Sequence, residues 1–283
     1  MTPQATDPIA VGVDGLQPAV LDYAATEARR TRHPIRLVRA FPRPASPRGS
    51  PYGMDISESM QAGGRRVLAA AAAHLTAAGV TTPIECSLVP GHPPHVLEDA
   101  SRHAAAVVVG QDEARPWYLH MFEGRVAQHV AGTTFSPLVI VPPTWRRSDG
   151  PRRVVVMVED GNGADGPLSY AVEMAHGHDA SLSVVQVVDH RLTRDEPHLS
   201  HLDGSVAAWF ERLPSLRGTY ATVTGLPADV VDGVVDDETL LVLAKPHVRR
   251  ILAFVATSFA RQIAADTPCV VAVIPSDYRW PPP

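Results

Sequence analysis

Short runs of apolar residues alternate along this chain with longer segments that are apolar on one side only. Residues 9–15 contain the first run, and residues 35–41 and 106–110 contain later ones. Apolar runs without regular polar alternation are typical of strands that are buried on both faces of a parallel sheet. The segment between the first two runs, residues 19–31, is rich in alanine and carries its apolar residues on one face, which predicts a helix.

The same order of elements occurs twice. The first run ends in Asp14 and Gly15, and a similar run at residues 154–161 ends in two acids and Gly161. Self-similarity at a long spacing indicates a tandem repeat of one structural unit. The elements that correspond in the two halves are helices 19–31 and 168–178, strands 35–41 and 182–188, helices 62–78 and 206–213, strands 106–110 and 240–244, and strands 137–142 and 268–275.

A third strand and a short helix complete each half, so the order βαβαβαβαβ occurs twice. This order predicts an α/β fold of two tandem doubly wound domains, each with a mainly parallel five-stranded sheet covered on both faces. We place the first domain at residues 1–143 and the second at residues 154–278. Residues 144–153 are polar and are interpreted as an exposed linker, and residues 279–283 as a tail. Two stretches, residues 42–55 and 189–204, are interpreted as loops that overhang the carboxyl ends of the strands.

Composition agrees with two ordinary globular domains. The chain has 283 residues, of which 45% are hydrophobic and 19% charged, and its net charge of -5 is spread along the sequence. No basic face for nucleic acid, no membrane-spanning run and no secretory signal is recognised, so we expect a cytoplasmic protein without nucleic-acid or membrane partners. The two cysteines, Cys86 and Cys269, are interpreted as small core residues.

Several landmarks of the repeat resemble the universal stress protein family, over nearly the whole chain and in both copies. They are the sequence at residues 11–15, the Gly91-x-Pro93 turn, the strand that ends at Gly110, and the closing strand at residues 137–142. The resemblance implies that each domain has the fold of the adenine nucleotide alpha hydrolases. It also implies that the closing strands of the two copies, residues 138–141 and 270–274, pair to form an intramolecular pseudo-dimer. Association of whole chains into homo-oligomers is a further option.

ATP-binding members of this family carry the pattern Gly, two residues, Gly, nine residues, Gly, then Ser or Thr, after the fourth strand. Glycines allow backbone amides to approach phosphates, and the next helix adds its N-terminal N–H groups. The first copy keeps Gly110 and Gly124 but has Glu113 in place of the second glycine and a loop one residue longer. The second copy has Ala244, His247 and Thr257 in place of the glycines, followed by Ser258. Both loops are therefore degenerate.

The resemblance places a nucleotide site in the first copy only, with ATP as its ligand if any is bound. Its expected residues are Asp14, Gly15, Ala40, Gly110, Gly124, Arg125 and Val126. Asp14 corresponds to a family position that contacts adenosine, but an Asp-Gly pair after a strand is also a common turn. Glu113 either repels phosphates or forms a structural ion pair with Arg125. In the second copy, Lys245 and the basic residues that follow it either attract an anion or form a solvated face.

No other catalytic pattern is present. The chain lacks a Walker A loop, a Rossmann glycine turn and a nucleophile elbow, so we expect no catalysis. The close histidine pairs are interpreted as scattered surface residues without a metal. They are His92/His95, His176/His178 and His198/His201. Trp145 and Trp280 lie near a domain end and the chain end, where a partner-binding contact or a frayed terminus is expected.

These observations predict a non-catalytic tandem stress-response module with degenerate nucleotide-binding loops. One alternative is an ATP-binding, slowly hydrolysing switch that uses the first domain only. Another is a purely structural interaction protein whose former pockets are filled by side chains.

Overall fold

The structure is a computed structural model, and it describes residues 7–41, 51–111, 126–146, 150–158, 164–188, 199–224, 231, 234–245 and 268–280. The side chains of residues 51–57 and of some others at helix and strand ends lie outside this description. Glu113, Gly124 and Arg125 lie outside it too, as do His198, His247, Thr257 and Ser258.

The first half shows the predicted alternation of strands and helices throughout, and the second half shows it as far as β8; most of the residues between β8, β9 and β10 lie outside the described ranges. The first half contains β1 (Ile9–Gly12), α1 (Pro18–Thr31), β2 (Ile35–Phe41), α2 (Pro51–Ala77), β3 (Ile84–Pro90), α3 (Pro93–Ser101), β4 (Ala106–Gly110), α4 (Val126–Thr133) and β5 (Leu138–Val141). The second half contains β6 (Arg153–Val158), α5 (Asp165–His178), β7 (Ser181–Val188), α6 (Leu199–Arg212), β8 (Gly218–Thr224), β9 (Thr239–Ala244) and β10 (Val270–Ile274).

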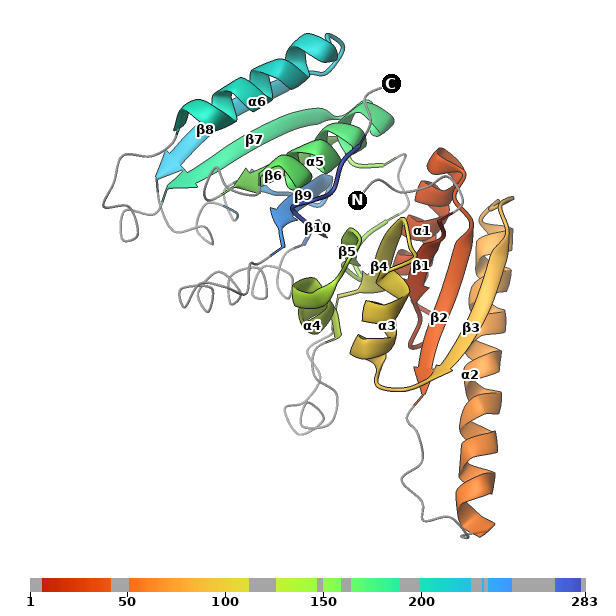
Figure 1. Cartoon of the computed structure of the whole chain (residues 1–283). Coiled ribbons are helices and arrows are strands. Elements are labelled where there is room, and N and C mark those ends of the chain that lie inside the picture. The colour runs from red at the N-terminus through yellow and green to blue at the C-terminus, as the bar shows by residue number, and fades with distance from the viewer. Residues whose placement is uncertain are drawn as a thin grey trace.

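The strands form one ten-stranded sheet in the order β3-β2-β1-β4-β5-β10-β9-β6-β7-β8. Within each half all neighbouring strands are parallel, and the order in the second half repeats that of the first. The halves join where β10 pairs antiparallel with β5, with Ala272 opposite Val139. Two five-stranded parallel units are therefore present as expected, but the pairing of their last strands makes them one continuous sheet rather than two separate ones (Figure 1).

Side chains alternate along the junction strands between two buried layers. Val139 and Ala272 belong to one hydrophobic cluster, whereas Ile140 and Val271 belong to the cluster on the opposite face of the sheet. Every residue of β5 and of β10 is buried. A strand that is apolar on both faces leaves no solvent-facing side, so each of these two strands needs both helical cover and a neighbouring strand.

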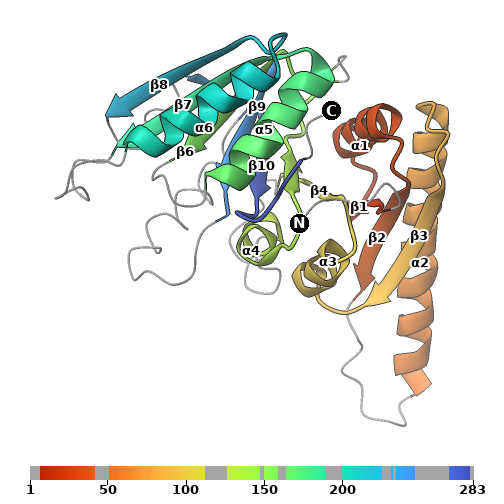
Figure 2. The same ribbon diagram turned by 45° about the horizontal axis from the view of Figure 1, so that its top comes forward.

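The helices in the described part of the chain lie on both faces of the sheet. Buried residues of α1, α2, α5 and α6 share one cluster that extends across both halves. Residues of α3 and α4 pack into the other cluster, on the opposite face. Figure 2 shows α1 and α5 on either side of the junction between the halves. None of the helices in the described ranges is long and apolar enough to span a membrane.

Two helices begin earlier than the sequence indicates. Helix α2 begins at Pro51, so residues 51–55 are helical and not part of the expected loop. Helix α6 begins at Leu199, within the second expected loop. Proline is compatible with the first turn of a helix, because its missing N–H group has no partner there. The proline at position 51 therefore marks the beginning of α2, and the rest of the expected loop, residues 42–50, lies outside the described residues.

The expectation for the cysteines is correct for one of them. Cys269 is buried beside β10, whereas Cys86 is exposed. Cys86 lies on β3, which is an edge strand of the sheet and has a neighbour on one side only. The core assignment of Cys86 is therefore wrong, because an apolar sequence context does not show whether a strand lies at the edge.

Neither of the two tryptophans is frayed. The ring of Trp145 packs edge-on against Tyr23, with 5.6 Å between centroids. Trp280 stacks on Trp209 at 6.2 Å, and its backbone N–H donates to the Ser169 hydroxyl at 2.7 Å. Both tryptophans pack against the large cluster of the sheet, which fixes the segments on either side of the second half.

Candidate functional site

The expected nucleotide site lies at the carboxyl end of β1. This strand pairs with β2 on one side and with β4 on the other. The chain therefore leaves β1 in one direction for β2 and β3, and returns across it to β4. In open α/β sheets, ligands bind at such a change of direction, outside the carboxyl ends of the strands. The topology brings Asp14 and Gly15, which follow β1, to the same edge as Gly110, which ends β4.

Asp14 contacts a basic residue that the sequence analysis did not single out. Its side chain is 72% exposed, and its Oδ1 lies 3.4 Å from Nη1 of Arg39 on β2. Arg39 also donates a hydrogen bond to the carbonyl of Val13 at 3.2 Å. A guanidinium held at this edge offers a planar donor to phosphate or carboxylate groups. Its position near the end of β2, next to the expected site residue Ala40, is the only sequence signal that could have found it.

The two glycines of this edge have different surroundings. A Cβ added at Gly110 would lie 2.8 Å from Nε2 of Gln17 and 3.4 Å from Cγ2 of Val20. Gly110 thus packs closely against the beginning of α1, and a side chain at this position would require the flexible end of Gln17 to move. A Cβ at Gly15 would have no neighbour within 4 Å, so this glycine faces open space.

The remaining expected site residues are placed only in part. Ala40 is half-buried on β2 opposite Val89, and Val126 is half-buried at the beginning of α4. Gly124, Arg125 and Glu113 lie outside the described residues, so the structure brings Asp14, Gly15 and Gly110 to one edge and leaves the phosphate loop undescribed.

In the second half, Lys245 follows β9 at the corresponding edge and contacts the first half instead. Its ammonium group donates a hydrogen bond to the carbonyl of Thr134 at 2.6 Å and lies 5.5 Å from the centroid of the Phe135 ring. Partial burial lowers the pKa of Lys245, although Asp277 and Glu98 oppose this effect. Lys245 is thus engaged in contacts between the two halves, and these contacts compete with the binding of a free anion.

A buried ionic cluster links α1 of the first half to the end of α5 in the second. One carboxylate oxygen of Glu27 accepts hydrogen bonds from Nε and Nη2 of Arg30, at 3.0 and 2.7 Å. Its other oxygen is 2.7 Å from Nε2 of His178, whose side chain is only 3% exposed. The interpretation of His178 as a surface histidine is therefore wrong, because the first half covers it.

Three tyrosines, Tyr23, Tyr170 and Tyr278, and a second acid, Glu173, lie close to this cluster. Tyr170 packs edge-on against Tyr278 at 5.5 Å between centroids, and the Tyr278 hydroxyl donates to Glu173. Burial raises the pKa of Glu173, and the hydrogen bond from Tyr278 and the charge of Arg30 only partly oppose this. The sequence could have indicated this cluster through the charged residues on the apolar face of α1, because charged residues are rarely buried unless they are paired.

Acid titration should reveal the Glu27 cluster. Burial alone would raise the pKa of Glu27, but Arg30 and His178 lower it from 4.5 to about 2. Because the folded-state pKa lies below the unfolded one, the stabilisation is complete above pH 4.5 and is lost as the pH falls towards 2. We expect the difference in unfolding free energy between wild type and Glu27→Gln, measured by urea denaturation, to shrink from about pH 5 to pH 3.

The raised pKa of Glu173 has the opposite effect, because its contribution to stability becomes less favourable as the pH rises. Glu173 is present in both proteins, and the charge of Glu27 is the smallest of the causes of its raised pKa, so most of this contribution cancels in the difference. Glu85→Gln provides the control, because Glu85 is 64% exposed in its pair with Arg36. A difference between wild type and Glu27→Gln that stays constant over this range would contradict the assignment.

The architecture defines an α/β protein in which two five-stranded parallel units share one sheet. Residues 6–142 match the model of the universal stress protein family. The first half of the chain therefore belongs to the universal stress protein family, as its landmarks indicated. No curated protein matches the chain.

Solved structures extend the likeness in fold to both halves. A universal stress protein from Archaeoglobus fulgidus is 16% identical, with a TM-score of 0.72 over 95% of this chain and 96% of its own. A putative universal stress protein from Pseudomonas aeruginosa is 12% identical, with a TM-score of 0.52 over 96% of this chain and 93% of its own. A shorter universal stress protein, solved in complex with cAMP, is 24% identical, with a TM-score of 0.38 over 50% of this chain and 99% of its own.

Proposed function

We propose that this protein is a cytoplasmic tandem universal stress protein that acts as a non-catalytic stress-response module. Its domains would be residues 1–143 and 154–278, joined by the linker 144–153, followed by the tail 279–283, and associated as an intramolecular pseudo-dimer. Any ATP binding would be confined to the first domain. The antiparallel pairing of β5 with β10 and the Glu27 cluster support the pseudo-dimer, because both are contacts between the halves.

One observation supports the proposal that only the first domain binds a ligand. At the first edge, Gly15 faces open space and the 72% exposed Asp14 pairs with Arg39, whereas at the second edge Lys245 is hydrogen-bonded to the other half. The degenerate loop of the second domain agrees, because Ala244, His247 and Thr257 add Cβ atoms where glycines would let backbone amides approach phosphates. The first domain is thus the one that keeps room for a ligand.

An ATP titration by calorimetry tests this proposal. We expect Glu113→Gly to bind ATP at least about tenfold more tightly than wild type, because it removes a negative charge and a side chain from the phosphate loop. Binding should reach one equivalent per chain, weaken when Asp14 is replaced by alanine, and stay unchanged in Ser258→Ala.

Glu238→Gly is the matched control, since it removes an exposed acid from a turn in the second half. Two equivalents of ATP, or a loss of binding in Ser258→Ala, would contradict the asymmetry. An affinity that is unchanged by Glu113→Gly would instead favour the structural interaction protein, with side chains such as Trp117 filling the pocket.

The alternative of an ATP-hydrolysing switch uses the same site, and phosphate release from ATP by the Glu113→Gly variant would support it. Association of whole chains into homo-oligomers would use other surfaces, because β5 and β10 are already paired. Light scattering at increasing protein concentration measures this association directly.

A further inference from the structure

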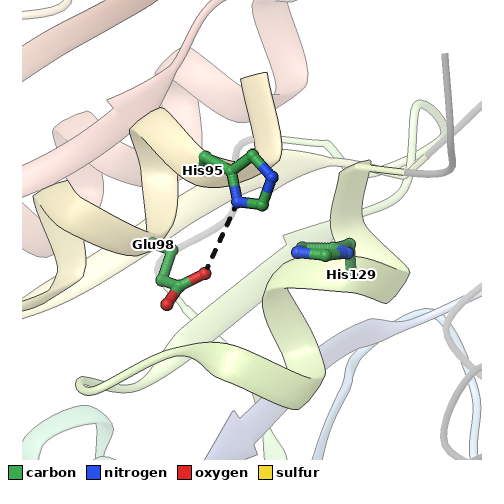
Figure 3. Close-up of side chains that lie close together, drawn as sticks. All are labelled: His95, Glu98 and His129. Atoms are coloured by element: carbon green, nitrogen blue, oxygen red, sulfur yellow. Dashed lines mark ion pairs between the residues drawn. The ribbon is translucent and has the colours of Figure 1, made fainter. Parts of the chain in front are cut away.

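Two helices of the first half bring two histidines and one carboxylate to the same space. His95 and Glu98 lie one turn apart on α3, and His129 lies on α4. One possible ligand atom from each of the three side chains lies within 4.8 Å of the other two. Figure 3 shows the three side chains grouped between the two helices. His95 was interpreted above as a scattered surface histidine, because the sequence shows no cysteine or paired acid at a zinc-like interval and β4 separates α3 from α4 along the chain.

The packing of the two helices holds this group in place. Leu97 of α3 and Ala127 and Val130 of α4 are buried in the same hydrophobic cluster. Residues 97 and 130 are adjacent to the ligand positions 98 and 129, so the backbone that carries the three side chains is fixed by the core. Sites carried by packed helices hold their ligands more exactly than sites carried by loops.

The side chains themselves remain free to adjust. His95 is 68% exposed, and its Nδ1 lies 3.9 Å from Oε2 of Glu98. The rings of His95 and His129 are nearly perpendicular, with 5.3 Å between their centroids. In a tetrahedral zinc site with bonds of about 2.0–2.2 Å, neighbouring ligand atoms lie about 3.4 Å apart. The observed distances between ligand atoms are somewhat longer, and small rotations about the side-chain torsion angles, within the same rotamers, can shorten them.

The carboxylate of Glu98 is oriented by a second contact. Its Oε1 lies 3.9 Å from Nη2 of Arg102, whereas its Oε2 faces His95. Arg102 is in turn stacked over the Phe135 ring, 3.7 Å from the centroid. Outer contacts of this kind orient a metal-binding carboxylate and leave its other oxygen available.

The ligand set indicates which ion it would bind. Two imidazoles and one carboxylate, with a fourth position open to water, are a common arrangement for Zn²⁺. Mg²⁺ and Ca²⁺ prefer oxygen ligands, so two nitrogen donors disfavour them. We propose that His95, Glu98 and His129 form a Zn²⁺ site completed by water on the surface of the first half. This proposal does not depend on nucleotide binding.

The test uses the full-length chain without any histidine tag. We expect calorimetry to show one equivalent of Zn²⁺ bound with micromolar affinity, and Co²⁺ to give the intense visible absorption of a four-coordinate site. His95→Ala and His129→Ala should each weaken Zn²⁺ binding at least about tenfold and abolish the Co²⁺ band. Glu98→Gln should also weaken binding, because it removes the anionic ligand while preserving the shape of the side chain.

His103→Ala is the matched control, because His103 is an exposed histidine just after α3 and outside the cluster. Circular dichroism establishes that each variant is folded. The proposal is overturned if the wild type shows no saturable Zn²⁺ binding, if His129→Ala binds as tightly as wild type, or if His103→Ala weakens binding as much as His95→Ala.

Discussion

Replacement of Glu27 by alanine will lower the free energy of unfolding by about 3–5 kcal/mol, because removing one partner of a buried ion pair leaves the other charge without compensation. Glu27 accepts two hydrogen bonds from Arg30 and contacts His178 of the other half, and its side chain is only 10% exposed. Equilibrium unfolding in urea at neutral pH measures this loss.

Two further variants distinguish the loss of a buried ion pair from the loss of an exposed charge. Glu85→Ala removes an acid whose pair with Arg36 is exposed, so it should cost less than about 1 kcal/mol. The double variant Glu27→Ala with Arg30→Ala should cost less than the sum of the two single variants, because the contact itself is counted twice in that sum. A cost for Glu27→Ala as small as that of Glu85→Ala would show that the cluster does not stabilise the fold.

Ala272→Asp at the junction of the halves should lower the free energy of unfolding by at least about 3 kcal/mol, because a carboxylate would be buried without a partner and the core would be overpacked. Ala272 is fully buried in the middle of β10, opposite Val139 of β5. The variant should also separate the unfolding of the two halves, which fluorescence and circular dichroism would detect as two transitions.

The exposed Ala73 of α2 offers a matched position, where the change to Asp should cost less than about 1 kcal/mol through helix propensity alone. If Ala272→Asp is no more destabilising than Ala73→Asp, then the junction between β5 and β10 does not hold the halves together.

The sequence by itself determined the order of the elements, the repeat and the family of the first half. These features are local, since buried strands, amphipathic helices and glycine-containing turns each leave a pattern within a few consecutive residues. The pairing of β5 with β10 was also predictable, through the resemblance of the closing strands to those of the family. The expected site residues Asp14, Gly15 and Gly110 meet at one edge because parallel strands end on the same side of a sheet.

Only the tertiary structure decided which of these residues are buried and which contact one another. Cys86 and Cys269 both belong to segments that the sequence predicts as strands, yet only the second is buried; Cys86 lies on the edge strand β3, whereas Cys269 precedes β10, which has a neighbour on each side.

Glu27 and His178 are 151 positions apart, and His95 and His129 lie on different helices, so no local pattern connects them. Their proximity follows from the packing of helices on a sheet shared by both halves. Burial and contact depend on which distant segments meet, whereas a sequence pattern records only the conformation of each segment.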